Sequence, residues 1–128
     1  MTHFFPIRVY YEDTDLAGIV YYANYLKYIE RARSEWVREL GIDQVQMKAD
    51  GFVFAVRRVE ADYLAPAKFD DELIVETTMA QGSGVRLVVQ QDVKRGDAVV
   101  FSAVVTIICM NEAGVVSRLP AAIRQSTH

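Results

Sequence analysis

The sequence predicts an α+β fold in which one curled antiparallel β-sheet wraps around one long central helix. Three observations support this: an early apolar repeat of helical period, four later segments dense in β-formers, and short glycine-containing breaks between those segments. Short breaks favour antiparallel neighbours, because parallel strands need crossovers of about a dozen residues or more. No repeat or linker marks a boundary, so we expect a single domain over residues 1–128.

The first half of the chain predicts a strand, a polar loop and a helix. Residues 7–11 are rich in β-formers and precede the polar residues 12–15 and the break at Gly18. From Asn24, apolar side chains recur at steps of three and four as far as Leu40, while charged side chains fill the opposite face. This segment is expected to form an amphipathic helix that ends at Gly41.

After a connector through Gly51, the chain is predicted to form four long strands. They cover residues 52–63, 72–80, 85–93 and 98–110, with breaks at 65–66, 81–84 and 95–97. Alternation along residues 85–90 predicts one solvent-exposed face, whereas the nearly all-apolar segment 98–110 is expected to be covered on both faces.

Composition excludes several classes of protein. The net charge of -3 and the pI near 5.3 argue against nucleic-acid binding, which needs a surplus of Lys and Arg. The single cysteine excludes an intramolecular disulfide, and no His or Cys cluster has zinc-ligand spacing, so no metal is expected. With no leader-like start and no long uncharged apolar run, we expect a cytoplasmic protein without a transmembrane segment. The hydrophobic content of 52% predicts either a face covered by a partner subunit or a large core.

The sequence argues against the common catalytic sites that use a serine or cysteine nucleophile. The histidines, His3 and His128, lie at the chain ends, where order is least expected, so a Ser-His-Asp or Cys-His arrangement lacks a base. Cys109 lies in the most apolar predicted strand and is expected to be a buried hydrophobic residue. The glycines at 82 and 84 lack the third glycine of a dinucleotide site and predict a hairpin turn.

Carboxylates remain as candidate catalytic groups, and residues 10–25 contain a cluster of them. A polar loop is followed there by Gly18, an apolar patch and the start of the predicted helix. Unpaired N–H groups at a helix start would polarise a carbonyl placed there, while a nearby carboxylate attacks it or activates water. The alternative is that Asp13, Thr14 and Asp15 only form turns and helix caps. Residue types alone leave both interpretations open.

Longer motifs carry a family resemblance. Residues 10–15 (YYEDTD), 18–22 (GIVYY), 24–25 (NY) and 30–36 (ERARSEW) resemble the signature of the 4-hydroxybenzoyl-CoA thioesterase-like family of hotdog-fold proteins. The nearest branch looks like the tol-pal-associated acyl-CoA thioesterases. Residues 63–67 (YLAPA) and 69–73 (FDDEL) also look like the family, so the resemblance spans essentially the whole chain.

The resemblance implies a hotdog fold and a homo-oligomer, a tetramer built from two dimers, with sheets joined edge to edge and active sites between subunits. It implies that Asp15 is the catalytic carboxylate, either as nucleophile or as general base, and that the backbone N–H of Tyr22 polarises the thioester carbonyl. Tyr11 is expected to line the same site. The tol-pal branch commonly has histidine where this chain has Tyr22, although tyrosine occurs there in the 4-hydroxybenzoyl-CoA branch.

Coenzyme A brings phosphates that need local positive charge. The resemblance points first to Arg86 with Ser83 and Gly84 at the adjacent turn. Weaker candidates are Arg57, Arg58 and Arg118, and the alternative for every arginine is a solvated surface charge. Coenzyme A would be part of the substrate, so no separate cofactor is expected.

The resemblance therefore implies hydrolysis of an acyl-CoA, or of an acyl carrier protein thioester, to a free acid and a thiol. One alternative is a non-catalytic module that binds acyl carriers or acyl-CoA in envelope or lipid metabolism. Dehydration of hydroxyacyl thioesters ranks lower, because related folds use a histidine that this chain lacks internally. The acyl group stays open, since Tyr22, Tyr25 and Tyr28 could line an aryl pocket or pack the helix on the sheet.

Overall fold

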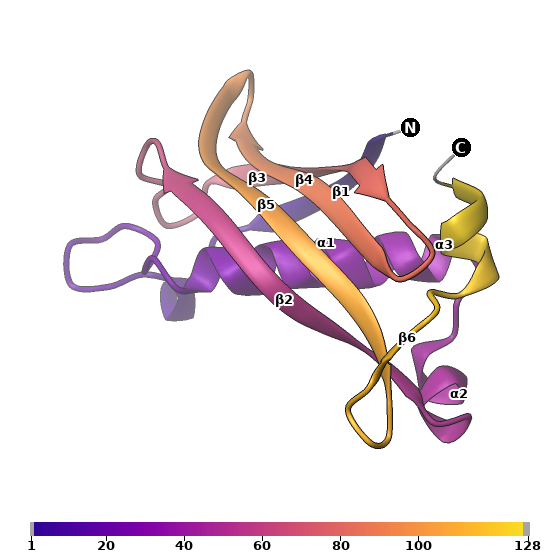
Figure 1. Cartoon of the computed structure of the whole chain (residues 1–128). Coiled ribbons are helices and arrows are strands. Elements are labelled where there is room, and N and C mark those ends of the chain that lie inside the picture. The colour runs from indigo at the N-terminus through magenta and orange to yellow at the C-terminus, as the bar shows by residue number, and fades with distance from the viewer. Residues whose placement is uncertain (1, 127–128) are drawn as a thin grey trace.

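The computed structural model describes residues 2–126, in which one curved sheet arches over one side of a long helix (Figure 1). The long helix is α1 (Asn24–Glu39), and a short 3-10 turn, η1 (Tyr11–Asp13), precedes it. The remaining elements, in chain order around these, are β1 (Thr2–Arg8), α2 (Gln44–Ala49), β2 (Phe52–Tyr63), β3 (Glu72–Gly82), β4 (Arg86–Arg95), β5 (Ala98–Asn111), β6 (Val116–Ser117) and α3 (Ala121–Ser126).

The sheet has the order β1-β3-β4-β5-β2, with β6 added beside β5, and these strands pair antiparallel. Strands β1 and β2 are therefore the two edges of the main sheet. The register of β2 against β5 shifts between Val56 and Arg58, which marks a bulge near the middle of this edge strand. The predicted antiparallel sheet is confirmed.

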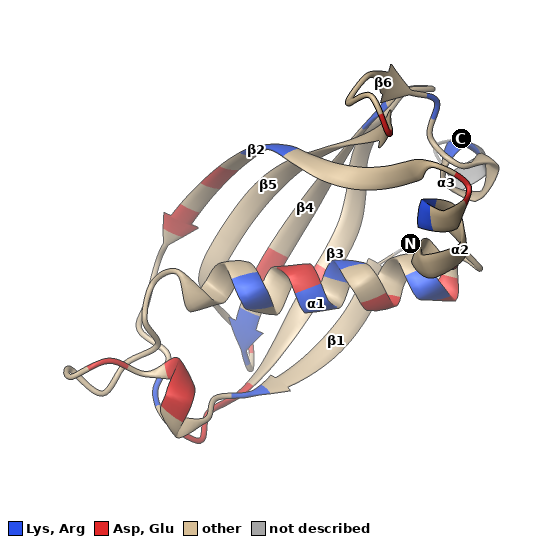
Figure 2. Cartoon of the chain, turned by 90° about the horizontal axis from the view of Figure 1, so that it is seen from below, with Lys and Arg blue, Asp and Glu red and all other residues tan. Residues whose placement is uncertain are grey.

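Helix α1 lies across the concave face of the sheet (Figures 1 and 2). Its apolar stripe is buried, as its period predicted; the buried residues are Tyr25, Tyr28, Ile29, Ala32, Trp36 and Val37. They pack into one core with inward-facing side chains of the central strands, such as Leu73, Leu87, Val89 and Val105. Burial of these two surfaces against each other stabilises the position of the helix beneath the sheet.

Strand β2 covers the predicted residues 52–63, whereas the first predicted strand is wrong in its position. Strand β1 covers Thr2–Arg8 rather than residues 7–11. Pro6 is tolerated because β1 is an edge strand, and the chain leaves the sheet at Val9, whose N–H donates to the carbonyl of Asp71. Helices α2 and α3 and strand β6 were not predicted; α2 begins after Asp43, whose carboxylate accepts N–H groups of the first turn.

Two further expectations are corrected. Strand β5 is not covered on both faces within one chain, because buried side chains such as Val105 alternate with partly exposed ones such as Thr106. His3 is not at a poorly ordered end: its side chain is only 9% exposed, and its Nε2 lies 3.4 Å from the carboxylate of Glu39. Because Glu39 ends α1, this imidazole lies at the opposite end of the helix from Asp15. Within residues 2–126, no helix combines the length and apolarity needed to cross a membrane.

Candidate active site

The loop before α1 is shaped by local hydrogen bonds. The N–H of Asp15 donates to the carbonyl of Ile19 at 3.0 Å, and the N–H of Gly18 donates to the carbonyl of Asp15 at 2.9 Å. Gly18 has φ of 79°, a left-handed conformation that favours glycine at this turn. The N–H of Val20 then donates to the carbonyl of Ala67 at 2.8 Å, which fixes the loop against the segment between β2 and β3.

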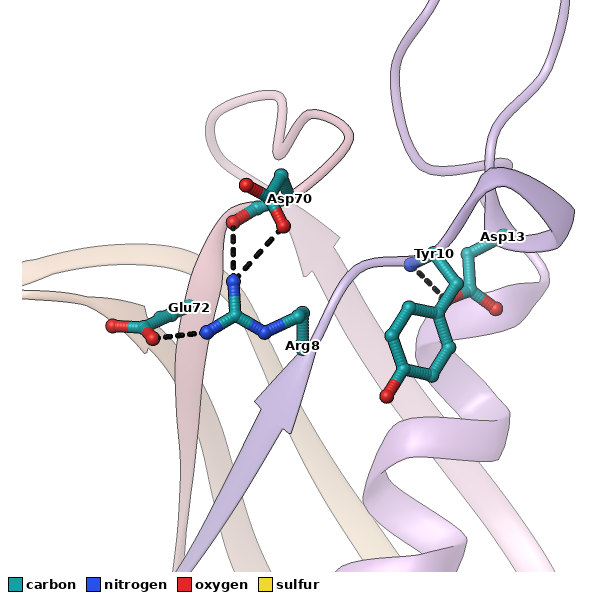
Figure 3. Close-up of polar contacts among 5 residues, drawn as sticks. All are labelled: Arg8, Tyr10, Asp13, Asp70 and Glu72. Atoms are coloured by element: carbon teal, nitrogen blue, oxygen red, sulfur yellow. Dashed lines mark hydrogen bonds and ion pairs between the residues drawn. The ribbon is translucent and has the colours of Figure 1, made fainter.

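Asp13 holds this loop together from inside. Its side chain is buried, and Oδ2 accepts the N–H of Tyr10 at 2.8 Å (Figure 3). Its carbonyl accepts two more hydrogen bonds, from the N–H of Tyr21 at 2.9 Å and from the side-chain amide of Asn24 at 2.9 Å. For Asp13 the interpretation as a turn-forming residue is therefore correct.

The carboxylate of Asp15 is differently placed, because the residue is exposed. Oδ1 accepts the N–H of Ala17 at 2.9 Å, and no other hydrogen bond or ion pair to this carboxylate occurs within residues 2–126. The pKa of Tyr21 is raised, first by its hydrogen bond with the Tyr22 hydroxyl and to a smaller extent by the charge of Asp15, which lies close by. One oxygen of Asp15 is thus oriented by the turn while the other can reach an incoming group.

The start of α1 presents donors without acceptors. In the described part of the chain nothing accepts the N–H of Tyr22, no side chain caps the helix at Ala23, and the first turn contains no acidic residue. The carbonyl of Tyr22 is held by the hydroxyl of Tyr63, which donates to it at 3.1 Å. The positive end of the helix dipole therefore faces outward beside Tyr22, where it favours negative charge on an oxygen.

Aromatic side chains surround this helix start. Tyr11 is 78% exposed, and its ring stacks on that of Phe69 with the centroids 4.2 Å apart. By contrast, Tyr25 and Tyr28 are buried, and Tyr25 stacks on Phe101 at 4.8 Å, so both residues pack the helix on the sheet. Burial is the main cause that raises the pKa of each of these two phenols.

Residues 17–102 of the chain match the family model of the thioesterase superfamily. The chain belongs to the thioesterase superfamily. The match begins two residues after Asp15 and therefore does not include this carboxylate.

Two curated relatives and one solved structure are similar over most of this thioesterase-superfamily chain. Acyl-CoA thioesterase YbgC of Haemophilus influenzae is 39% identical over 84% of this chain and 79% of its own length. Acyl-CoA thioester hydrolase YbgC of Escherichia coli is 37% identical over 83% of this chain and 80% of its own length. The crystal structure of a probable thioesterase from Bartonella henselae superimposes with a TM-score of 0.89 at 36% identity, covering 94% of this chain and all of that one. The hotdog fold expected from the sequence is confirmed.

The predicted phosphate-binding residues of this superfamily member lie away from Asp15 within one chain. Ser83 shapes the β3–β4 turn, because its Oγ accepts the N–H of Arg86 at 3.0 Å. The N–H of Leu119, next to Arg118, donates to the carbonyl of Gly84 at 2.8 Å, which brings the C-terminal segment to the same turn. This turn lies beside the C-terminal half of α1, whereas Asp15 precedes its first residue (Figure 1).

Arg57 and Arg58 occupy the bulge in edge strand β2. Nη2 of Arg58 lies 2.6 Å from Oε1 of Glu60, so part of its charge is already paired. No ion pair of Arg57, Arg86 or Arg118 occurs within the described residues. Arg86 and Arg118 therefore keep free charge at one end of the sheet, and Arg57 keeps it at the middle of the edge.

Sequence reasoning missed several residues of the site. The hydrogen bond from the Asn24 side chain to the carbonyl of Asp13 joins residues 11 positions apart and is not a helix cap, so the capping preference of asparagine does not predict it. The stacking of Phe69 on Tyr11 joins residues 58 positions apart and had no sequence signal. Cys109 is buried as predicted, and burial raises the pKa of its thiol, so it stays protonated near neutral pH.

Proposed function

We propose that this protein hydrolyses acyl-CoA thioesters, with Asp15 as catalytic carboxylate and the backbone N–H of Tyr22 as the donor that polarises the carbonyl. The observation that carries the proposal is the unpartnered Tyr22 N–H at an uncapped helix start, in the same loop as an exposed carboxylate oriented by a turn. The YbgC relatives named as acyl-CoA thioesterases support the choice of substrate.

The reaction needs a hydrogen-bond donor for the carbonyl oxygen and a carboxylate that acts as nucleophile or base. As the thioester carbonyl is attacked, its oxygen gains negative charge, which a fixed N–H at a helix start stabilises without reorganisation. Asp15 either attacks the carbonyl carbon, expelling the thiolate and forming an anhydride that water cleaves, or removes a proton from the attacking water. A single turnover in ¹⁸O-labelled water tests the first route: label in the Asp15 carboxylate identifies an anhydride that water opens at the aspartyl carbon, whereas the general-base route labels the product acid alone.

The site is proposed to be completed by a second copy of the chain. Strand β2 is an edge of the sheet, and its helix-facing side chains Val56 and Val59 are exposed. Antiparallel pairing of two β2 strands about their midpoints would join the sheets and cover both edges. It would also bring the end of one β2 beside the start of the other, and the β2 end contacts Tyr22 through Tyr63.

The same pairing supports a role for the distant arginines. Arg86 of one copy, with Ser83, Gly84 and Arg118 near it, would approach the Asp15 loop of the other copy and meet the phosphates of coenzyme A. Arg57 and Arg58 would lie along the joined edges. A tetramer of two such dimers is part of the proposal, and light scattering after gel filtration measures the stoichiometry.

The direct test is release of thiol from short-chain, long-chain and aromatic acyl-CoAs, and from an acyl carrier protein thioester. Asp15→Asn is expected to reduce turnover ~10²-fold or more, as removal of a general base or nucleophile implies. Asp97→Asn, which changes an exposed aspartate of the β4–β5 turn, is the matched control and should keep wild-type turnover. Wild-type-like turnover of Asp15→Asn would refute the assignment.

The rival function gives a different result in the same assay. A non-catalytic module would bind acyl-CoA or the acyl carrier protein saturably and release no thiol from any chain length. The proposed composite site also predicts that specific activity falls when the protein is diluted below its dimer dissociation constant. A monomer with full activity would contradict the shared site.

A further inference from the structure

A cavity of about 230 Å³ lies between the C-terminal half of α1 and the sheet, and the proposed catalytic residues do not line it. Most of its wall is apolar and includes Trp36, Phe54, Leu87, Ile107 and Ile123. Its polar groups are Glu30, Arg33, Ser34 and Gln44. A small, mainly apolar cavity with a few polar groups is typical of a ligand pocket.

Arg33 is the unusual member of this wall. It is only partly exposed, and no carboxylate within residues 2–126 lies within ion-pair distance of its guanidinium. Burial lowers the pKa of Arg33, an effect that the charge of Glu30 only partly opposes. A cation in an apolar pocket costs free energy unless an anion or strong acceptor meets it, and here the protein supplies a single neutral acceptor.

That acceptor also fixes where the guanidinium lies. Nη1 of Arg33 donates to Oε1 of Gln91 at 2.9 Å. Gln91 is fully buried, and its amide donates to the carbonyl of Ile29 and to Oγ1 of Thr77, both at 2.9 Å. Because the amide of Gln91 is itself held by two hydrogen bonds, one edge of the guanidinium is anchored, while its other N–H groups have no acceptor among the described residues.

The position of the cavity relates it to the proposed reaction. Its wall includes Phe54, Ala55 and Val56, near the start of β2, whereas Tyr63 at the end of β2 contacts the Tyr22 loop. In the antiparallel β2 pairing proposed above, the cavity of one chain therefore faces the helix start of the other. An acyl group whose carbonyl lies at Tyr22 of one copy would extend into the cavity of its partner.

We infer that this cavity binds the acyl group and that Arg33, positioned by Gln91, selects acyl groups carrying a hydrogen-bond-accepting oxygen at the end remote from the thioester. This inference rests on the proposed thioesterase function and names its substrate class. A terminal carboxylate would neutralise Arg33, and a terminal hydroxyl would accept from it while donating to Glu30. A substrate with a terminal carboxylate and a substrate with a terminal hydroxyl, tested separately, show which of the two groups Arg33 prefers.

The experiment compares hexanoyl-CoA, its ω-hydroxy derivative and adipoyl-CoA, which have the same carbon chain. In the wild type, kcat/KM is expected to be higher for at least one oxygenated substrate than for hexanoyl-CoA. Arg33→Met, which keeps an unbranched apolar stem but removes the guanidinium, should lower that ratio by roughly tenfold or more, because the substrate oxygen then loses its hydrogen-bond donor. The ratio is measured within each variant, so a partly unfolded preparation does not change it.

The matched control is Arg31→Met, which removes an exposed arginine from the same helix and should leave the ratio unchanged. Arg33→Lys should retain part of the preference for adipoyl-CoA, because the charge survives. If Arg33→Met slowed all three substrates equally, Arg33 would serve the reacting group or the fold, and the inference would be overturned.

Binding of the product acids gives a readout that does not depend on turnover. Adipate or ω-hydroxyhexanoate is expected to raise the melting temperature of the wild type more than hexanoate does, and this difference should disappear in Arg33→Met. Equal shifts for all three acids in the wild type would overturn the inference even if thiol release is found. If no acyl-CoA is cleaved but the selective shift is seen, the proposed reaction fails and the pocket assignment survives.

Discussion

The side-chain amide of Asn24 donates a hydrogen bond to the carbonyl of Asp13 across 2.9 Å, and so ties the first residue of α1 to the loop that carries Asp15. Together with the hydrogen bond from the N–H of Tyr21 to the same carbonyl, this contact closes the loop of residues 14–20 and so sets the position of the Asp15 carboxylate relative to the free N–H of Tyr22.

Asn24→Ala should lower the free energy of unfolding by about 1 kcal/mol, the typical net value of a hydrogen bond. It should also lower kcat roughly tenfold, because a loosened loop holds Asp15 less precisely. Urea unfolding and thiol release measure the two effects. Asn111→Ala, which loosens a turn far along the chain, should affect stability alone.

Replacement by asparagine is expected to lower stability at Asp13 and to lower turnover at Asp15. Asp13→Asn weakens a buried contact with the N–H of Tyr10 and should cost about 1–3 kcal/mol of unfolding free energy. Asp15→Asn should leave the unfolding free energy within about 0.5 kcal/mol, as expected at an exposed position, while turnover is lost. A stable, active Asp13→Asn protein would contradict the structural role of this carboxylate.

Tyr22 is predicted to act through its backbone. Tyr22→Phe and Tyr22→His keep the N–H and should retain kcat within about threefold, because its side chain is exposed. Tyr22→Pro removes the donor and should lower kcat by ~10²-fold, the cost of losing one oxyanion donor. Circular dichroism checks that the proline variant keeps its helix. A large loss in Tyr22→Phe would instead assign a role to the phenol.

Asp71 should contribute to acid stability. Burial opposes ionisation, but hydrogen bonds from the N–H of Lys68 at 2.8 Å and from Arg95 at 3.0 Å lower its pKa overall. Its stabilising effect is therefore present above the ordinary aspartate pKa of about 3.9 and is lost as pH falls through the lowered folded-state value. Urea unfolding of Asp71→Asn should show lower stability at pH 7 and a shallower decline in acid than the wild type.

The buried thiol should be dispensable for catalysis. Cys109 is 1% exposed and burial raises the pKa of its thiol, so Cys109→Ala should keep wild-type kcat while losing about 1–2 kcal/mol of unfolding free energy from the small cavity. Iodoacetamide should modify the wild type only after unfolding. Rapid labelling of the native protein, or loss of kcat in Cys109→Ala, would contradict this assignment.

Local patterns predicted the elements that depend on local forces. The apolar period from Asn24 predicted α1, and the β-formers predicted β2, because one face of each must be buried whatever its partner is. The start of β1 could not be predicted, since Pro6 is acceptable only at a sheet edge, and edge position is a property of the whole sheet. Residue types alone did not separate the roles of Asp13 and Asp15; only the family resemblance pointed to Asp15 as the catalytic carboxylate.

The sequence by itself determined an antiparallel sheet around one helix, a carboxylate-rich loop before that helix, and the family resemblance. Only the tertiary structure decided that Asp13 is buried while Asp15 stays exposed, and that Arg33, which donates to Gln91, lines a cavity that neither aspartate lines. Side-chain period and turn chemistry act over a few neighbouring residues. Burial and the pairing of residues distant in sequence depend on how the sheet closes around the helix, which short-range patterns do not encode.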